Sequence, residues 1–146
     1  MIDKMTKTDL LKHAKNNNIP NVNNNMNKAE IIETIDKHQM LQKRKQIQND
    51  LLDQLDRNGV VGEFYIDLVN DYMAMWDVKN RLIADIEAKG VSIKYQNGEN
   101  QWGYKKNDSV GELQRTNNQM LKLLDHLGLK PSKADTETFD LSDLEM

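Results

Sequence analysis

Few residues in this chain have types and spacing suited to chemistry, and those that do favour binding over catalysis. The stretch GENQWGYK, residues 98–105, spaces two glycines as a phosphate-binding loop does. Such a loop needs a lysine directly after the second glycine and a hydroxyl residue after that, because these side chains contact the phosphates and magnesium. Tyr104 occupies the lysine position. We therefore predict a polar turn here rather than a nucleotide site.

Histidines and carboxylates do not form an evident catalytic or metal site. The three histidines have no histidine partner four residues away, as a helical metal pair requires; they are His13, His38 and His126. Four aspartates recur in one predicted helix, namely Asp67, Asp71, Asp77 and Asp85. They form either a carboxylate site or a solvated helix face, and the intervening Lys79 and Arg81 favour the second interpretation. Because no nucleophile is paired with a base, and there is no cysteine, we predict a protein that is not an enzyme and uses no cofactor or metal.

Positive charge is concentrated at the N-terminus, where it can meet a polyanion. Residues 1–48 contain nine Lys or Arg and five Asp or Glu, whereas residues 49–146 contain eleven and eighteen. Lysine and arginine bind nucleic acids by neutralising phosphates. The candidate DNA-binding residues are Lys12, Lys15, Lys28, Lys37, Lys43, Arg44 and Lys45. For each single residue a solvated charge is the alternative, so the prediction applies to the cluster.

The two tryptophans each have two interpretations. Trp76 lies on an apolar helical stripe, so it belongs either to the core or to a contact between subunits. Trp102 lies near Tyr95, Tyr104 and two lysines, and aromatic rings beside positive charge can stack on nucleic-acid bases. Packing of Trp102 over the end of a hairpin is the alternative, and it is the one we expect.

Two N-terminal helices position the basic residues. Residues 6–15 carry apolar side chains at helical spacing after a threonine, Thr6 or Thr8, that can cap the helix. Asn27 and Glu30 form a capping-box pattern that opens a second helix. Between the helices, seven of the ten residues 16–25 are asparagine, which fits either a disordered tract or an ordered loop. The apolar residues spaced through this tract favour the ordered loop; they are Ile19, Val22 and Met26.

The middle of the chain predicts long helices. Helical periodicity continues through residues 39–57, which include the basic joint Lys43–Lys45. The pattern leaves open whether residues 28–57 form one helix or hinge at this joint. The longest predicted helix spans residues 61–90 and stops at Gly90.

The predicted helix of residues 61–90 has two adjacent apolar stripes, which together are more apolar surface than one partner helix can cover. The first stripe contains Tyr65, Leu68, Tyr72, Trp76, Ile83 and Ile86, and the second contains Phe64, Met75, Val78 and Leu82. We therefore expect copies of the chain to associate through it. The candidate interface residues are Phe64, Tyr65, Leu68, Tyr72, Met75, Trp76, Leu82 and Ile83.

The following residues predict an antiparallel helical hairpin. Residues 91–108 form a β-hairpin or an extended loop around an Asn-Gly turn. The next helix begins with a capping box between Ser109 and Glu112 and ends at Gly128. Its inward residues are Leu113, Met120, Leu121, Leu124 and Leu127. The fold class is therefore all-α.

This organisation divides the chain into four segments. They are a DNA-binding module at residues 1–38, a helical linker at 39–58, an oligomerisation core at 59–130 and a flexible acidic tail at 131–146. The tail has three large apolar residues that a partner could bind, namely Phe139, Leu141 and Leu144. No segment has the pattern of a membrane span or signal peptide, so we expect a cytosolic protein.

From residue 55 to residue 133 the order of motifs resembles the small subunit of a tailed-bacteriophage terminase, of the type found in phages of Gram-positive hosts. The matching stretches are DLVNDYMAMWDVKNRLIADIEAKG, then NG and KKNDSVGEL, then NNQMLKLLDHLGLKPS. Separately, residues 6–38 resemble a SAP-type helix–extended-loop–helix nucleic-acid-binding module. That second resemblance rests on Leu10-Leu11, the apolar loop residues and KAEIIETI, and it departs from the usual pattern in having asparagines where a glycine often precedes the second helix.

The terminase resemblance implies a non-enzymatic subunit that recognises the packaging site on viral double-stranded DNA. It also implies a homo-oligomeric ring, recruitment of the large terminase subunit with its ATPase and nuclease, and a C-terminal segment that contacts the motor or the portal. Such a protein acts in the host cytoplasm and is not retained in the mature virion. The alternatives are a SAP-like transcription regulator, which would form a defined dimer, and a structural phage connector or adaptor, which would stay in the particle.

Overall fold

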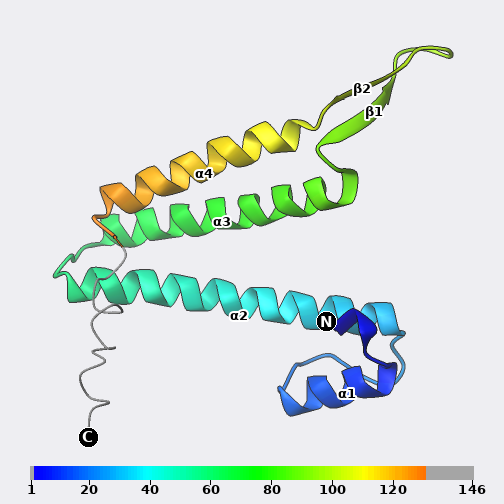
Figure 1. Cartoon of the computed structure of the whole chain (residues 1–146). Helices are drawn as coiled ribbons and strands as arrows, with labels where there is room; N and C mark the ends of the chain where they lie inside the picture. Colours follow the sequence, from blue (N-terminus) through cyan, green and yellow to red (C-terminus); the bar gives the residue numbers. More distant parts are fainter. Residues whose placement is uncertain (1, 131–146) are drawn as a thin grey trace, which may run out of the picture. The chain divides into compact units, whose positions relative to one another are not determined.

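The computed structural model describes residues 2–130, and these form four α-helices and one β-hairpin (Figure 1). In chain order the elements are a 3-10 helix Ile2–Lys4, α1 Lys7–Asn16, α2 Lys28–Arg57, α3 Glu63–Lys89, β1 Ser92–Gln96, β2 Trp102–Lys106 and α4 Asp108–His126. The predicted all-α fold with a short hairpin between long helices is confirmed. The chain divides into two compact units after Asp50. α2 runs unbroken through Lys43–Lys45, so residues 28–57 form one helix.

The first unit packs α1, the asparagine-rich loop and the start of α2 around a small apolar core. Its buried residues are Leu10, Ala14, Ile19, Ile31 and Ile35, and Val22 and Met26 of the loop pack against them. Because apolar side chains from the loop enter this core, the loop is held in place along its length. The prediction of an ordered loop is confirmed.

Reciprocal side-chain caps start both helices of this unit. Thr6, rather than Thr8, caps α1: its Oγ1 accepts the Asp9 N–H at 3.2 Å, and the Asp9 carboxylate accepts the Thr6 N–H at 3.3 Å. At α2 the Asn27 side chain accepts the Glu30 N–H at 2.9 Å, and the Glu30 carboxylate accepts the Asn27 N–H at 2.8 Å. Each exchange gives a hydrogen-bond acceptor to two backbone N–H groups that have no partner within the helix.

One of the asparagines has the role that glycine usually plays at a helix end. Asn18 has a φ of 52°, in the left-handed region that asparagine tolerates better than most residues. This turn lets the Ile19 N–H reach the Ala14 carbonyl at 2.9 Å and the Asn18 N–H reach that of Lys15 at 3.2 Å. The same pair of bonds closes α2 at Gly59 and α4 at Gly128. The asparagines therefore end one helix and shape the loop before the next.

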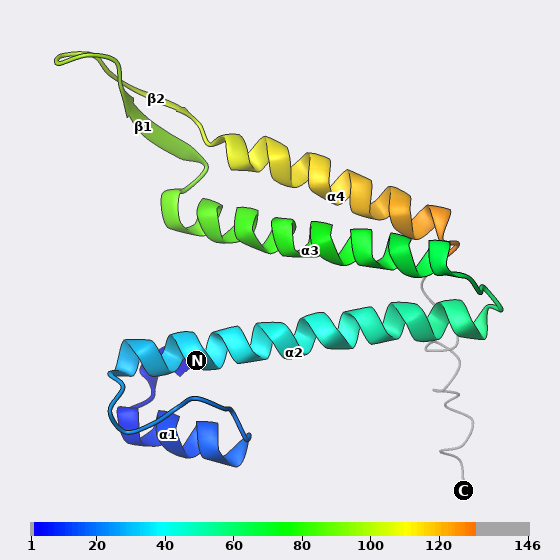
Figure 2. The same cartoon turned by 180° about the vertical axis from the view of Figure 1, so that it is seen from behind.

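In the second unit α3 and α4 lie side by side and antiparallel, joined through the β-hairpin at one end (Figure 2). The buried apolar residues of this unit are Leu51, Leu55, Val69, Met73, Trp76, Met120, Leu127 and Leu129. The predicted helical hairpin is confirmed.

Two details of the predicted packing are wrong. The buried face of α3 is centred on Val69 and Met73, which the predicted stripes omitted. Leu121, predicted to point inward, is 56% exposed. Each residue turns a helix by about 100°, so Leu121 lies a quarter-turn or more from buried Met120. Apolar residues lie on several faces of these helices, so helical periodicity alone does not identify the buried face.

The connection between α3 and α4 is a β-hairpin of five paired positions, from Ser92 opposite Lys106 to Gln96 opposite Trp102. Of the two structures that the sequence allowed, the hairpin is correct. The expectation that Trp102 packs over its end is wrong, because the side chain is 59% exposed. Trp102 opens β2 on a two-stranded ribbon, which offers no second layer to cover it.

Candidate nucleic-acid interface

The first unit carries all seven predicted DNA-binding residues. Lys12 and Lys15 lie on α1, and the other five lie on α2. Six of the seven side chains are exposed, whereas Arg44 is half-buried. The unit therefore presents positive charge to solvent, as a phosphate-binding surface requires.

Four of these seven basic side chains line hollows of the unit, and they do not all line the same one. Lys12 and Lys15 line a hollow between α1 and the loop residues Val22–Asn24. Lys37 lines a second hollow. Lys43 lines a third. Lys12 and Lys15 of α1 thus line one hollow together.

The basic joint is not a single surface. Lys43, Arg44 and Lys45 are consecutive in a helix, so their side chains point about 100° apart from one another. A phosphate backbone that lies along one side of this helix therefore does not face all three side chains equally. Lys28 is partly engaged within the unit, because its ammonium donates to the Asp3 carbonyl at 2.9 Å.

Two histidines that sequence reasoning treated as isolated border the same hollow as Lys43. His13 lies on α1 and His38 on α2, and Asn17 also lines this hollow. The Asn17 amide donates to the His13 carbonyl at 2.8 Å. No spacing rule could pair the two histidines, because they come from different helices.

The predicted interface face of α3 remains partly uncovered in the single chain. Phe64 is 62% exposed, and its ring meets Tyr65 edge-on at a centroid distance of 5.6 Å. Leu68, Tyr72, Met75, Leu82 and Ile83 are half-buried. Burial raises the pKa of Tyr72 above its ordinary value. By helical angle this face lies roughly a third of a turn from the buried Val69 and Met73.

Trp76 does not belong with these residues. It is 7% exposed, so it is a core residue of its own chain and not a contact available to a second copy. Its helical angle places it beside Val69 and Met73, on the edge of the predicted stripe that faces inward. Of its two interpretations, the core is correct.

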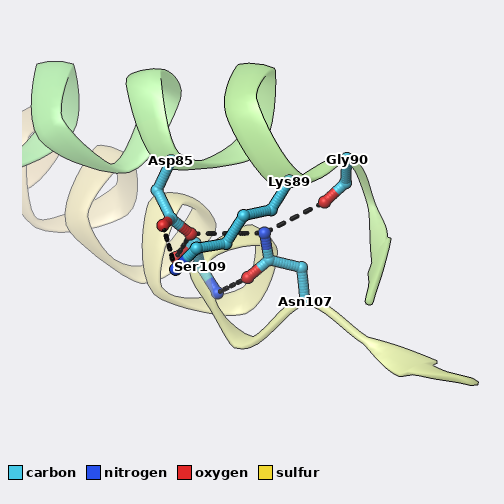
Figure 3. A network of polar contacts seen from close by, with 5 residues as sticks. All are labelled: Asp85, Lys89, Gly90, Asn107 and Ser109. Atoms are coloured by element: carbon cyan, nitrogen blue, oxygen red, sulfur yellow. Dashed lines mark hydrogen bonds and ion pairs between the residues drawn. The ribbon is translucent and has the colours of Figure 1, made fainter. Parts of the chain in front are cut away.

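A polar network fixes the base of the β-hairpin, where α3 ends and α4 begins (Figure 3). Asn107 is the one buried polar residue within the described chain, at 3% exposure. Its Nδ2 donates to the Gly90 carbonyl at 3.0 Å and to Asp85 Oδ2 at 3.3 Å, and its Oδ1 accepts the Ser109 N–H at 3.1 Å. Asn107 is thus the N-cap of α4, and the predicted Ser109–Glu112 capping box is wrong.

Asp85 is the centre of this network. Lys89 Nζ lies 2.6 Å from Asp85 Oδ1, and the Ser109 hydroxyl donates to Oδ2 at 2.7 Å. The bonds from Lys89, Ser109 and Asn107 lower the pKa of Asp85 to about 2. Asp85 is therefore a structural carboxylate, used in holding two helix ends together. This finding also weakens the carboxylate-site interpretation, because one of its four aspartates is already engaged.

Within residues 2–130 no group of three or more His, Asp or Glu side chains is placed to hold a metal ion. Over the same residues, no helix combines the length and apolar character of a membrane span. The predicted tail residues Phe139, Leu141 and Leu144 lie outside the described residues.

A comparison with protein families finds a match that covers the C-terminal part of α2 and most of the second unit. The sequence model of the family described as phage terminase, small subunit, matches residues 45–136. No match was found among the curated proteins or the solved structures. Small terminase subunits have a role in viral DNA packaging, in which DNA and the large subunit take part, and are generally non-catalytic. Since the match covers more than half of the chain and includes the whole helical hairpin, this protein belongs to the phage terminase small subunit family.

Proposed function

We propose that this protein recognises the packaging site on viral double-stranded DNA and recruits the large terminase subunit, without catalysing a reaction itself. The observation that carries the proposal is a separate, folded, basic unit joined to the region that matches the family. The match begins at residue 45, so most of the basic unit lies ahead of it. This N-terminal unit is a folded module with exposed lysines, which can contact the phosphates of DNA.

The N-terminal unit is the proposed DNA-binding module. Its order of helix, extended loop and helix is that of the SAP-type modules it resembles in sequence, and its loop is held by apolar residues and by backbone bonds. Because the lysines border separate hollows, one copy makes few phosphate contacts at once. A single module therefore binds DNA weakly and depends on others for affinity.

A homo-oligomeric ring supplies that multiplicity. The uncovered face of α3, with Phe64 at its N-terminal end, is the proposed contact between copies. Once one module of a ring is bound, the next binding event is intramolecular, so affinity rises steeply with the number of modules that reach the same DNA. The acidic tail, with Phe139, Leu141 and Leu144, is the proposed contact with the large subunit or the portal. In this scheme the protein acts in the host cytoplasm and leaves the particle before it matures.

The test is a comparison of two variants with equal loss of charge. In the first, Lys43, Arg44 and Lys45 are changed to Ala. In the second, three exposed basic residues of the other unit are changed to Ala, namely Arg81, Lys122 and Lys130. Binding of a labelled duplex containing the viral end site is measured over a series of salt concentrations.

The first variant should bind the duplex more weakly and with a shallower salt dependence, while the second should match the unaltered protein. Each lost phosphate contact reduces the slope of log K against log salt by about 0.9, and the divergence of the three side chains predicts a reduction of about 1 to 2. Equal effects in both variants, or an unchanged slope in the first, would remove this segment from the DNA contact.

The mass of the native assembly, measured with and without the same duplex, tests the ring. A large closed assembly that retains its subunit number on DNA agrees with the proposal. A stable dimer would instead favour a transcription regulator, and a monomer that remains monomeric on DNA would contradict the avidity mechanism.

A further inference from the structure

The two faces of the β-hairpin have different chemistry. Residues directly opposite in the β1–β2 register share a face, so Lys94 lies with Tyr104, and Trp102 and Lys106 lie on the same side. These four residues are called the aromatic–lysine face. The opposite face carries Ile93, Tyr95, Gly103 and Lys105.

Both rings of the aromatic–lysine face are open to solvent. Trp102 is 59% exposed and Tyr104 is 74% exposed. Lys94 Nζ lies 4.2 Å from the centroid of the Trp102 ring, which is a cation–π contact. Neighbouring aromatic side chains with this exposure are typical of a surface that binds a ligand or a partner.

On the opposite face the one aromatic ring, Tyr95, is less exposed, at 41%, and the base of the hairpin is fixed. The ring of Tyr95 lies across Gly103 so closely that a Cβ on Gly103 would come within 2.7 Å of it. The Asn107 network holds the strands to the ends of α3 and α4 (Figure 3). The aromatic–lysine face thus carries the more exposed rings of a ribbon whose base is held in place.

Charge around the hairpin indicates the class of ligand. Residues 91–107 contain three lysines and a single glutamate, in a half of the chain that is otherwise strongly acidic. A positive, aromatic surface is complementary to a nucleic acid, because lysines pair with phosphates and rings stack on bases. The rest of this unit is acidic and is therefore not complementary to the phosphates of a nucleic acid.

The arrangement of the aromatic residues distinguishes this surface from the N-terminal unit. Residues 1–48 contain no Phe, Tyr or Trp, so that unit can bind phosphates but has none of the large aromatic rings on which bases stack most strongly. In a duplex each base is covered by its neighbours, and stacking on a protein ring needs an unpaired base. The hairpin therefore fits a ligand that the N-terminal unit does not.

We propose that the aromatic–lysine face of the β-hairpin binds single-stranded DNA, with Trp102 and Tyr104 stacking on unpaired bases and Lys94 and Lys106 contacting the phosphates. This site is independent of the duplex recognition proposed above. It lies in the second unit, and it requires no sequence specificity, because every base has a face on which a ring can stack.

The experiment measures binding of a labelled short oligothymidylate to the full-length protein by fluorescence anisotropy, with a labelled duplex measured in parallel. The test variant is Trp102→Ala with Tyr104→Ala. Each lost stacking contact should weaken oligothymidylate binding about fivefold or more, whereas duplex binding should change less than about twofold. Trp102→Phe keeps a ring at this position and should retain most of the affinity.

A matched pair of lysine variants tests which face is used. Lys106→Gln removes a charge from the aromatic–lysine face, and Lys105→Gln removes the same charge from the opposite face one residue away. Lys106→Gln should weaken oligothymidylate binding more than Lys105→Gln. Equal effects would reduce the site to general electrostatic attraction and would overturn the proposal.

Tryptophan fluorescence supplies a readout that does not depend on affinity. Since Trp76 is buried and Trp102 is exposed, quenching by acrylamide reports mainly on Trp102. Oligothymidylate should protect this signal, and the protection should be absent in Trp102→Phe. If Trp102 is already shielded in the protein alone, a second copy covers the hairpin and the proposal is wrong.

The two proposals fail in distinguishable ways. Loss of duplex binding in the Lys43–Lys45 variant with unchanged oligothymidylate binding supports both. Absence of duplex binding in the unaltered protein contradicts the packaging-site proposal alone. A Trp102 and Tyr104 double variant that binds oligothymidylate normally, or that loses both ligands equally, contradicts the hairpin proposal alone.

Discussion

Replacement of Asn107 by Ala should destabilise the second unit by about 2–3 kcal/mol. The side chain is 3% exposed and makes three hydrogen bonds that Ala cannot make. Loss of the bond from the Ser109 N–H removes the N-cap of α4, which costs about 1 kcal/mol. The Gly90 carbonyl also loses its side-chain donor in a partly buried place, which costs about 1–2 kcal/mol more. Lys89 and Ser109 still hold Asp85, so the third bond adds little.

Urea unfolding followed by circular dichroism, at one fixed protein concentration, measures this effect. Domains of this size are stable by about 5–15 kcal/mol, so the midpoint should move visibly with an unchanged slope. Asn100→Ala, at an exposed turn position of the same hairpin, is the control and should change stability by less than about 0.5 kcal/mol. Asn107→Asp keeps the cap acceptor but places a carboxylate against Asp85, and it should be destabilising at neutral pH and less so in acid.

The reasoning would be refuted by an Asn107→Ala variant that unfolds at the same urea concentration as the unaltered protein. It would also be refuted if Asn107→Ala and Asn100→Ala were equally destabilised. The first result would mean that loss of the buried side chain costs nothing, and the second that the cost is not specific to the Asn107 network.

Two further predictions concern single residues. The pKa of Asp85 is lowered to about 2 from its ordinary value of 3.8, so the charged carboxylate stabilises the fold above pH 3.8 and this contribution is lost as the pH falls towards 2. Asp85→Asn should therefore lower the stability at neutral pH and make the loss of stability in acid less steep, which urea midpoints measured across this pH range would show. An equally steep loss of stability in the variant would count against the network. Because Asn18 has a positive φ, Asn18→Ala should destabilise the first unit by about 1 kcal/mol, whereas Asn18→Gly should be neutral or slightly stabilising. Hydrogen exchange of the α1 amides measures this difference, and equal exchange rates in the two variants would contradict the left-handed turn at Asn18.

The parts of the fold that the sequence predicted well are those set by local chemistry. The Asn27 and Glu30 cap, the stops at Gly90 and Gly128 and the hairpin between long helices each depend on a few neighbouring residues. Ordering of the asparagine-rich loop was also predictable, because apolar residues in a polar tract need a core to enter. For the loop and the hairpin the sequence left one alternative open in each case, and the structure has the ordered loop and the β-hairpin.

The errors arose where the outcome depends on contacts between distant segments. α3 has apolar residues around much of its circumference, so periodicity alone could not separate the inward Trp76 from the outward Phe64. Ser109 followed by Glu112 matches a capping box, but Asp85, on another helix, takes the Ser109 hydroxyl. The exposure of Trp102 and the grouping of His13 with His38 and Lys43 likewise depend on tertiary placement.

One helix contributes to both hydrophobic cores. α2 places Ile31 and Ile35 in the first unit and buries Leu51 and Leu55 in the second. The region of family similarity begins at residue 45, in the middle of this helix. A cut at that boundary would leave all five buried residues of the first core, and the Asn27 cap, on the N-terminal fragment, while Leu51 and Leu55 would stay with the second unit. Each fragment would nevertheless gain a new helix end without a cap, because the Asn27 cap and the closing bonds at Gly59 lie at opposite ends of α2.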